Sequence, residues 1–556
     1  MKKKIIDLLS KELKIKKDKI KNLIEIPPEE MGDFAFPCFQ LAKKEKKSPL
    51  LIAENLAEKL RRNGLGKDID NIEARAGYVN FFIDKKILAA RILKSALKRD
   101  YGGQKIKLEG MIEFSQANTH KAFHVGHIRG TSIGESLARI AEFMGERVIR
   151  ANYEGDIGMH VAKWIWCYTK YHSKEKLKQD EAWIAGIYVE AIRRLSENEK
   201  FQEEVNEINK QLEERSDKKL NELWRKTRKL SLDALNIIYK DLNTYFDKYY
   251  FESQFEESGK KIAYELVKKG IAEISEGAVI VNLEKYNLGI WVLLRKDGTV
   301  LYSAKDLALA LQKFKDYKLD WNVYIHGGEQ TLHFNQLFKV LELMGFKDLK
   351  KCYHFGFGLV RLPTGKMSSR TGENILYSDF KKEITDYASK EIKKRFKLSK
   401  NEVERRALII SIAAIKYSML KQDINNIIIF DKEKALQFEG DTGPYLLYSY
   451  ARASSILRKI KIRKKIKIID LKKEEIALIK KISSFPEIIE KAYEEFAPNI
   501  IANYSFELSQ LFNEFYHSCP VLGSLEEGFR LKLVEAFKIT LGKGLGLLGI
   551  DVLEEM

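Results

Sequence analysis

The chain has 556 residues, of which 45% are hydrophobic and 32% charged, and its formal net charge is +19. This length exceeds one ordinary hydrophobic core and predicts two to four domains, and the composition is typical of a globular protein in water. The longest apolar run, "ALIISIAAI", is too short to cross a bilayer, so no membrane association is expected. Charges interrupt the basic N-terminal segment every few residues, which predicts an amphipathic helix and no secretion signal.

The excess of positive charge favours a polyanionic partner, because each phosphate that a basic side chain neutralises releases counterions. A lysine-rich solvated surface explains the same charge, and composition alone leaves both interpretations open. The four cysteines, Cys38, Cys167, Cys352 and Cys519, are far apart in sequence, so neither a Cys-x-x-Cys zinc site nor a disulfide framework is predicted. We therefore expect reduced thiols and a cytoplasmic protein.

Three regions follow one another along the chain. Residues 1–103 mix short helical stretches with the strand-like "ARAGYVNFFI", which predicts a small α+β domain. Residues 104–380 alternate strands and helices, with a charged helical insertion expected at about 170–275. Residues 381–556 consist of amphipathic helical stretches and predict an all-α domain.

The α/β region begins with a strand–loop–helix–strand unit. "KLEGMIEF" and "RVIRANY" predict two strands, and Ile133, Leu137, Ile140 and Met144 recur at helical spacing between them. Gly145 is placed to end that helix. Strands joined through a helix lie parallel in one sheet, and "GAVIVNL", "WVLLRKDGTVLY" and "WNVYIHG" continue the strand pattern after the insertion.

The loop before the first helix reads "NTHKAFHVGH" and holds His120, His124 and His127, a third of the nine histidines in the chain. Backbone N–H groups and the helix dipole favour an anion at such a helix N-terminus, and Gly126 lets a ligand approach closely. His124 and His127 share a face of the first turn, where two imidazoles suit the phosphates of a nucleotide.

Two other interpretations of the three histidines compete with a nucleotide site. They are packing or capping residues, or they bind a metal, since their i, i+4, i+7 spacing suits one. A metal site is disfavoured because no nearby Cys, Asp or Glu supplies a fourth ligand. The stretch alone favours the nucleotide and leaves the other two interpretations open.

A second motif, "GKMSSRTG", brackets two hydroxyls with two cations. Lys366 and Arg370 flank Ser368 and Ser369, and a loop of this composition closes on polyphosphates. A polar surface turn would give the same string.

The two motifs, in this order and with an insertion between them, resemble the two signatures of class I aminoacyl-tRNA synthetases, whose consensus forms are HIGH and KMSKS. The sequence "EFSQANTHKAFHVGHIRGTSIGESLARIAEFMGERVIRANYEGDIG" is similar to the arginyl-tRNA synthetase family. Further similar stretches extend the resemblance over nearly the whole chain: "LNTYFDKYYFES", "VLLRKDGTVLYSAKDLALAL", "GGEQTLHFNQLFKVLELMGF", "DTGPYLLYSYARASSILRK" and "GLGLLGIDVLEEM".

The resemblance implies ATP-dependent ligation of L-arginine to tRNA(Arg) through an arginyl-adenylate, with AMP and pyrophosphate as the other products. It implies a Rossmann-type catalytic domain at 104–380, a tRNA-elbow-binding domain at 1–103, and a helical stem with an anticodon-binding domain at 381–556. ATP is expected as a substrate carrying Mg²⁺ on its phosphates, and no zinc is expected. We expect a cytoplasmic monomer.

The resemblance also assigns roles to residues of the two motifs. His124, His127, Lys121, Lys366 and Arg370 are expected to act electrostatically on ATP, and Gly126, Ser368 and Ser369 to complete its site. We expect no covalent enzyme intermediate.

The family's arginine-binding positions fall at Glu113, Asn118, Tyr302, Asp306 and Gln330. A carboxylate suits a guanidinium, which presents paired N–H donors, and Tyr302 and Asp306 share a helical face if a helix begins there. Without the surrounding match, a core tyrosine and a capping aspartate would explain that pair.

The family's tRNA-binding positions fall at Tyr445, Tyr448 and Arg452 near the C-terminus, and at Tyr78 and Asn80 near the N-terminus. The first three share a helical face, and aromatic and guanidinium planes stack on unpaired bases. A core-facing aromatic stripe is the alternative. Tyr78 and Asn80 are two apart, on one side of a predicted strand.

Two departures from the family pattern bear on the site. Gln116 stands where serine is usual, which affects substrate geometry, and Lys305 replaces the usual arginine before Asp306. Three other hypotheses fit less well. A cysteinyl enzyme would need a cysteine cluster, a small-molecule ligase of the superfamily would lack the helical C-terminal region, and a non-catalytic RNA-binding relative would not need both motifs.

Overall fold

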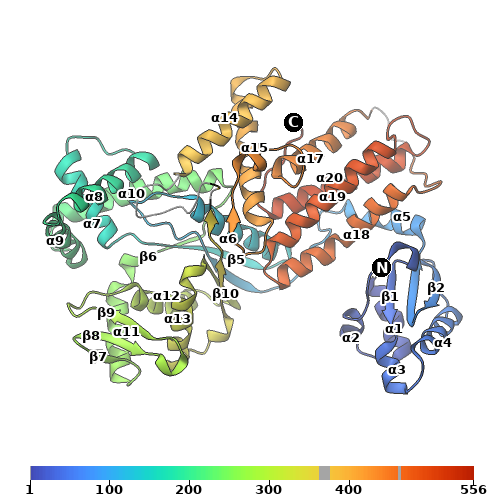
Figure 1. The fold of residues 1–556 in the computed structure, drawn as a ribbon, viewed down its shortest axis with the longest axis horizontal. Coiled ribbons are helices and arrows are strands. Elements are labelled where there is room, and N and C mark those ends of the chain that lie inside the picture. Colours follow the sequence, from blue (N-terminus) through green and yellow to red (C-terminus); the bar gives the residue numbers. More distant parts are fainter. Residues whose placement is uncertain (1, 362, 364–375, 461–464) are drawn as a thin grey trace. The chain divides into compact units, whose positions relative to one another are not determined.

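The computed structural model describes residues 2–361, 363, 376–460 and 465–556 (Figure 1). The motif "GKMSSRTG", with Lys366, Ser368, Ser369 and Arg370, lies outside the described residues. The chain divides into two compact units. One comprises residues 1–101, 460–484 and 511–539, and the other comprises residues 102–459, 485–510 and 540–556.

The first unit contains a three-stranded antiparallel sheet in the order β1-β3-β2, drawn in blue in Figure 1. Its N-terminal elements are α1 (Lys2–Leu13), α2 (Lys17–Lys21), β1 (Phe34–Pro37), α3 (Phe39–Glu45), α4 (Pro49–Arg62), β2 (Ile69–Arg75), β3 (Tyr78–Ile83) and α5 (Lys85–Ala96). The stretch expected as one strand at 74–83 contains the last two residues of β2, a hairpin turn and β3. Ala76 and Gly77 make this turn, because both adopt positive φ angles, 51° and 82°.

A five-stranded sheet forms the centre of the second unit, and each neighbouring pair of its strands is parallel. Its order is β11-β10-β4-β5-β6, with β4 (Glu109–Glu113), β5 (Arg147–Glu154), β6 (Lys248–Phe251), β10 (Trp321–Gly327) and β11 (Cys352–Phe357). Helix α6 (Val125–Phe143) connects β4 to β5, and Gly145 follows it with φ at +98°. The predicted strand–loop–helix–strand unit and its glycine stop are therefore confirmed.

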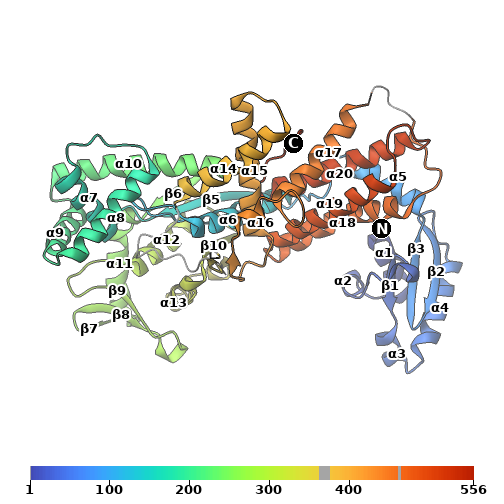
Figure 2. The same ribbon diagram turned by 45° about the horizontal axis from the view of Figure 1, so that its top comes forward.

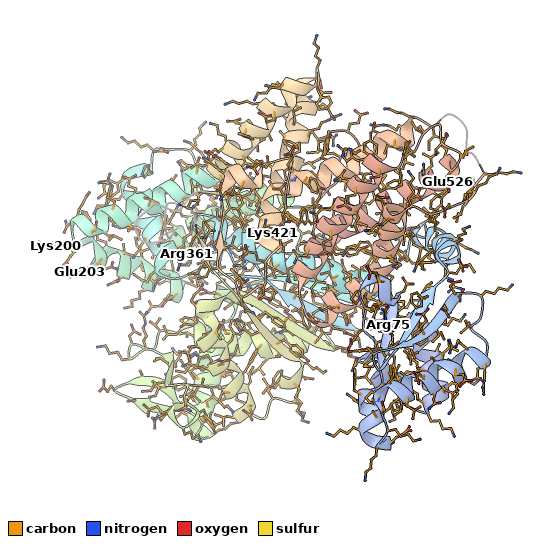
Figure 3. The ribbon with its side chains drawn as sticks, turned by 45° about the vertical axis from the view of Figure 1, so that its right-hand side comes forward. Arg75, Lys200, Glu203, Arg361, Lys421 and Glu526 are labelled. Carbon is orange, nitrogen blue, oxygen red and sulfur yellow. The ribbon has the colours of Figure 1, made fainter. Side chains whose placement is uncertain are left out.

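The charged insertion consists of helices, as predicted, but its span differs. It comprises α7 (Met159–Cys167), the π-helix η2 (Tyr168–His172), α8 (Glu181–Glu197), α9 (Phe201–Glu214) and α10 (Lys218–Asp241). Strand β6 lies inside the expected range of 170–275 yet joins the central sheet, because its four residues are too few to show an alternating pattern. Figure 3 shows Lys200 and Glu203 pointing outward at the end of the insertion, and both are exposed.

A smaller antiparallel sheet follows the insertion, with β7 (Glu273–Ser275), β8 (Ala278–Asn282) and β9 (Ile290–Leu294). Helices α11 (Glu256–Lys268), α12 (Tyr302–Asp316) and α13 (Thr331–Leu343) accompany it (Figure 2). Trp291 and Leu293 of β9 share one buried core with Leu307 of α12 and Leu337 of α13. This core fixes α12 and α13 side by side, and both helices carry site residues.

The remaining elements are α14 (Tyr377–Arg395), α15 (Lys400–Leu420), α16 (Lys432–Ala435), α17 (Gly443–Arg458), α18 (Lys473–Glu494), α19 (Pro498–Ser518), α20 (Glu527–Leu547), and a parallel pair of β12 (Val360–Arg361) with β13 (Ile428–Ile429). The expected all-α region therefore contains one two-residue strand. Among the described residues, no helix is long and apolar enough to cross a membrane.

Packing around α6 gives a first testable prediction. A Cβ at Gly134 would lie 2.1 Å from Cγ of the buried Phe114. We expect Gly134→Ala to lower the free energy of unfolding by about 1–3 kcal/mol, because overpacking outweighs the roughly 1 kcal/mol that alanine gains over glycine in a helix. Urea unfolding measures the difference.

Gly186 in α8 is the matched control, since a Cβ there would meet no atom within 4 Å. Gly186→Ala should therefore leave stability unchanged or raise it by up to about 1 kcal/mol. If both variants are equally stable, the packing of α6 against Phe114 is not the constraint we infer.

Candidate active site

His124 and His127 lie together at the N-terminus of α6. Their rings stack with centroids 3.8 Å apart. The backbone N–H of His124 donates to Nδ1 of His127 at 3.1 Å. Because this nitrogen accepts a hydrogen bond, a neutral His127 carries its proton on Nε2, which is then a donor. A Cβ at Gly126 would lie 3.0 Å from Cε1 of His124, so only glycine leaves this ring undisturbed.

Burial keeps both imidazoles unprotonated at neutral pH. Together with a smaller effect of the neighbouring Lys121, burial lowers the pKa of His124 to about 4. Burial, His124 and Lys121 hold the pKa of His127 well below its usual value. Burial and Lys163 lower the pKa of Lys121, whose Nζ lies 5.4 Å from the centre of the Tyr188 ring. The helix terminus thus offers neutral N–H donors beside a lysine.

The third histidine of the motif is a satisfied core residue. His120 is 1% exposed. Its Nδ1 bonds Oγ1 of Thr119 at 2.9 Å, and its Nε2 bonds Oγ1 of Thr227 at 2.8 Å. Both ring nitrogens are occupied, so the packing interpretation holds for His120 and a three-histidine metal site is excluded.

Within the described parts of the chain, Cys167, His172 and Glu190 form the one group with the composition of a metal site. The two nitrogens of His172 bond Glu175 at 2.6 Å and Glu190 at 2.9 Å, and Arg194 also pairs with Glu190. Burial raises the pKa of the Cys167 thiol to about 12, so this group is not a thiolate at neutral pH. These contacts satisfy the group without a metal ion.

Four carboxylates gather near the carboxyl ends of the central strands: Glu113, Asp156, Glu252 and Asp306. Burial raises the pKa of Glu113 and of Glu252, and the charge of Asp306 raises both further. The positive charge of Lys313 acts to lower the pKa of Glu113, and that of Lys305 acts to lower the pKa of Glu252. The pKa of Tyr153 is held well above its usual value by burial and then by all four carboxylates. We call this group the acidic pocket.

Asp306 is the member of the acidic pocket that pairs with no lysine or arginine among the described residues. Its Oδ2 bonds Nε2 of His333 at 2.6 Å. Its Oδ1 is buried and has no hydrogen-bond partner among the described residues. Tyr302 begins α12 one turn earlier, is 55% exposed, and has its ring centre 4.8 Å from that of His333. The predicted placement of Tyr302 and Asp306 on one turn of a helix is therefore confirmed.

The other predicted arginine-binding residues lie around the same strands. A Cβ at Gly155 would lie 2.1 Å from Oδ1 of Asn118 and 3.1 Å from Oε1 of Glu252, so glycine leaves room for both side chains. Glu113 ends β4 and is already paired with the fully buried Lys313. Gln330 ends the short helix η5 (Gly328–Gln330), directly before the helix that carries His333.

Sequence reasoning missed three residues that the structure brings to this region: Glu181, Glu252 and His333. Both oxygens of Glu181 accept backbone N–H groups, from Phe123 at 3.3 Å and from Ser378 at 3.1 Å, and burial raises its pKa to about 7. Glu181 therefore joins helix α8 of the insertion to the residue before His124. Glu252 and His333 lie in the quoted stretches "YFES" and "TLHF", and that likeness was the only available signal for them.

The predicted aromatic face of α17 is present. Tyr445, Tyr448 and Arg452 are half-buried, whereas Leu446 and Leu447 between them are fully buried. Arg452 donates from Nη2 to the Tyr448 hydroxyl at 2.9 Å, and its guanidinium lies 4.7 Å from the centre of that ring. All three residues thus keep part of their surface exposed, while the Tyr445 ring also packs against Phe506 with centroids 5.7 Å apart.

Tyr78 and Asn80, the predicted tRNA-binding pair near the N-terminus, are less accessible than the residues on α17. Tyr78 begins β3, is half-buried, and packs its ring edge-on against Phe39 with centroids 5.2 Å apart. Asn80 is only 2% exposed, because β3 is the middle strand of its sheet and the chain at Gly32 lies close to its Cβ. The expectation that the Asn80 amide faces a nucleotide does not agree with this burial.

A parallel sheet with a histidine pair at its first strand–helix junction, near a group of four carboxylates, agrees with the arrangement of a class I tRNA synthetase. The class I (R) catalytic-domain model matches residues 90–432, the DALR anticodon-binding-domain model matches 446–556, and the arginyl tRNA synthetase N-terminal-domain model matches 1–83.

Named relatives agree with these matches. Arginine–tRNA ligases of Clostridium perfringens and Clostridium acetobutylicum are each 37% identical to the chain, and the alignments cover 100% of both sequences. The solved arginyl-tRNA synthetase of Thermus thermophilus matches with a TM-score of 0.83 at 26% identity, covering 100% of both chains. The Plasmodium falciparum enzyme shares the fold, with a TM-score of 0.78 at 22% identity. The chain belongs to the arginyl-tRNA synthetase family.

The lowered pKa of His124 predicts a pH dependence of stability. In the folded chain this imidazole takes up a proton near pH 4, against about 6.5 when unfolded, so the unfolded state binds more protons between these values. This contribution to the free energy of unfolding is full above about pH 6.5 and declines as the pH falls towards 4. We expect His124→Asn to flatten the dependence in thermal melts from pH 7 to pH 4.5. His517→Asn, at an exposed position, should leave the slope unchanged, and a His124→Asn slope equal to wild type would contradict the assignment.

Proposed function

We propose that the chain ligates L-arginine to tRNA(Arg). The carboxylate of arginine attacks the α-phosphate of ATP to form arginyl-adenylate and pyrophosphate, and a terminal ribose hydroxyl of the tRNA then takes the arginyl group and releases AMP. Family membership supports the reaction. The single structural observation that supports arginine as the substrate is the buried, unpaired Oδ1 of Asp306 within the acidic pocket, since a guanidinium is the group that such an oxygen would bind.

We propose that the N-terminus of α6 holds the phosphates of ATP. His127 would donate from Nε2, and His124 and Lys121 stand beside it. Neutral imidazole donors stabilise charge that grows on an attacked phosphate without transferring a proton, and Gly126 keeps the approach open. Lys366, Ser368, Ser369 and Arg370 are proposed from the sequence to bind the β- and γ-phosphates.

Mg²⁺ is proposed to arrive with ATP. Phosphate oxygens are the hard ligands that this ion prefers, and imidazole nitrogens are not. The histidine pair is therefore assigned to the phosphates and not to the ion, which would reduce the negative charge of the phosphates.

Arginine is proposed to lie with its guanidinium towards Asp306 and Tyr302 and its amino-acid end towards Asn118 and Gln330. Glu113 supports this site indirectly, because its own charge is already matched by Lys313. We add Glu252 to the proposed site, since its carboxylate and the Asn118 amide both lie beside Gly155.

The tRNA is proposed to contact three regions. Residues 1–103 would bind its elbow, with Tyr78 as the accessible member of the predicted pair. Residues 104–380 would receive its acceptor end. Residues 381–556 would bind the anticodon loop through Tyr445, Tyr448 and Arg452. A cytoplasmic monomer remains part of the proposal. Charging total tRNA with each of the twenty amino acids tests the function, and charging by an amino acid other than arginine would overturn it.

Asp306 gives the sharpest test of substrate selection. Asp306→Asn keeps the shape and removes the charge, so a buried guanidinium would lose its partner. Such losses commonly cost about 2–5 kcal/mol, or roughly 30- to 4,000-fold in arginine kcat/KM. The KM for ATP should change little. Asp386→Asn, at an exposed position on α14, is the control, and near wild-type charging of the Asp306 variant at low arginine would exclude the role.

Tyr448 gives a second test, on RNA binding. Loss of a base-stacking ring costs about 1–3 kcal/mol, so Tyr448→Ala should weaken tRNA binding roughly 5- to 150-fold. Tyr448→Phe, which keeps the ring, should remain within a few-fold of wild type. The dissociation constant measured across a potassium chloride series should keep the wild-type salt slope, because no phosphate contact is removed. A slope flattened by about one unit would indicate a phosphate contact instead.

A further inference from the structure

His333 lies between Asp306 and an indole in the second unit. It sits in the first turn of α13, and its side chain is 8% exposed. On one side its Nε2 bonds Oδ2 of Asp306 at 2.6 Å. On the other side Nε1 of Trp291, in β9, bonds Nδ1 of His333 at 3.3 Å. Three separate elements thus supply one hydrogen-bonded chain from indole to imidazole to carboxylate.

The direction of this chain follows from its first member. An indole N–H only donates, so Nδ1 of His333 must be the unprotonated, accepting nitrogen. The ring proton therefore lies on Nε2, where it is donated to Oδ2 of Asp306. Without such a donor behind it, the imidazole would be free to place its proton on either nitrogen.

Fixing one oxygen of Asp306 determines where the other points. The terminal torsion of an aspartate is broad and roughly two-fold, so an unrestrained carboxylate rotates easily. Lys305, beside Asp306 in the chain, pairs instead with Glu252 and Glu256, and the pocket carboxylates repel Asp306. The hydrogen bond from His333 is thus the contact that holds Asp306 with Oδ1 unpaired.

We propose that His333 is a positioning residue for arginine recognition, with Trp291 fixing its tautomer. This inference rests on the proposed role of Asp306 at the guanidinium. His333 does not need to touch arginine, because its effect is transmitted through the orientation of the carboxylate. A two-pronged guanidinium requires that orientation, since a bidentate contact fails when the acceptor plane rotates.

The test is steady-state pyrophosphate exchange and aminoacylation by the full-length chain, with the KM for arginine and for ATP measured separately. His333→Ala removes a hydrogen bond to a charged group and should raise the arginine KM about 10- to 100-fold while the ATP KM stays within about two-fold. His333→Gln restores an N–H donor near the position of Nε2 and should recover most of the affinity. Trp291→Phe should give an intermediate rise of about 3- to 10-fold.

Trp321→Phe is the matched control, because it removes an indole N–H that donates to Glu146 outside this chain of bonds. Its arginine KM should equal that of wild type. An unchanged arginine KM in His333→Ala, or equal rises in the KM for arginine and for ATP, would overturn the proposal. If His333→Ala does not fold, the arginine KM of His333→Gln is compared with that of His333→Asn. A KM for His333→Gln that is no lower than that for His333→Asn would then overturn the proposal.

Asp306→Asn in the same assay distinguishes the proposed role of Asp306 at the guanidinium from the proposed positioning role of His333. Loss of arginine affinity in Asp306→Asn but not in the His333 and Trp291 variants leaves the role of Asp306 standing and removes that of His333. Retained affinity in Asp306→Asn removes both.

Discussion

One unpaired carboxylate oxygen is the constraint to which the rest of the site responds. A buried carboxylate oxygen without a hydrogen-bond partner is costly, and Oδ1 of Asp306 has none among the described residues, whereas Oδ2 bonds His333. Lys305 pairs with Glu252, and Lys313 pairs with Glu113. Because neither lysine pairs with Asp306, this carboxylate would be available to a cation from outside the chain.

Opposite charges lie close together at the carboxyl edge of one sheet. The N-terminus of α6 and Lys121 favour anions, whereas the acidic pocket favours cations. The two regions are close, because the charge of Glu252 affects the pKa of Lys121. In the proposed complex, the guanidinium would be repelled from the first region and the phosphates from the second. The orientation of both substrates would then follow from electrostatics, with the arginine carboxylate left facing the α-phosphate.

The sequence predicted the parts of this arrangement that depend on local pattern. The strand–loop–helix–strand unit, the end of α6 at Gly145 and the helical face of Tyr302 with Asp306 all follow from periodicity and spacing. Local pattern failed where tertiary neighbours decide. Three histidines at helical spacing looked alike, yet His120 became a core residue because Thr227 of a distant helix satisfies it. Asn80 lies between core residues along β3, as the alternation predicts. However, β3 is the middle strand of its sheet, and the Asn80 side chain is covered.

Two imidazoles of the site, His127 and His333, share a feature that local pattern does not show, because in each a hydrogen-bond donor determines which ring nitrogen carries the proton. Nδ1 of His127 accepts a backbone N–H, and Nδ1 of His333 accepts an indole N–H. In each case an N–H donor on one nitrogen directs the ring proton to the other, so the same arrangement serves the nucleotide region and the acidic pocket. A motif marks the imidazole but not its donor, because the donor can be a backbone group or a residue from another element. Motif and family resemblance can therefore point to these imidazoles and carboxylates, whereas the hydrogen bonds that place their protons emerge only from the folded chain.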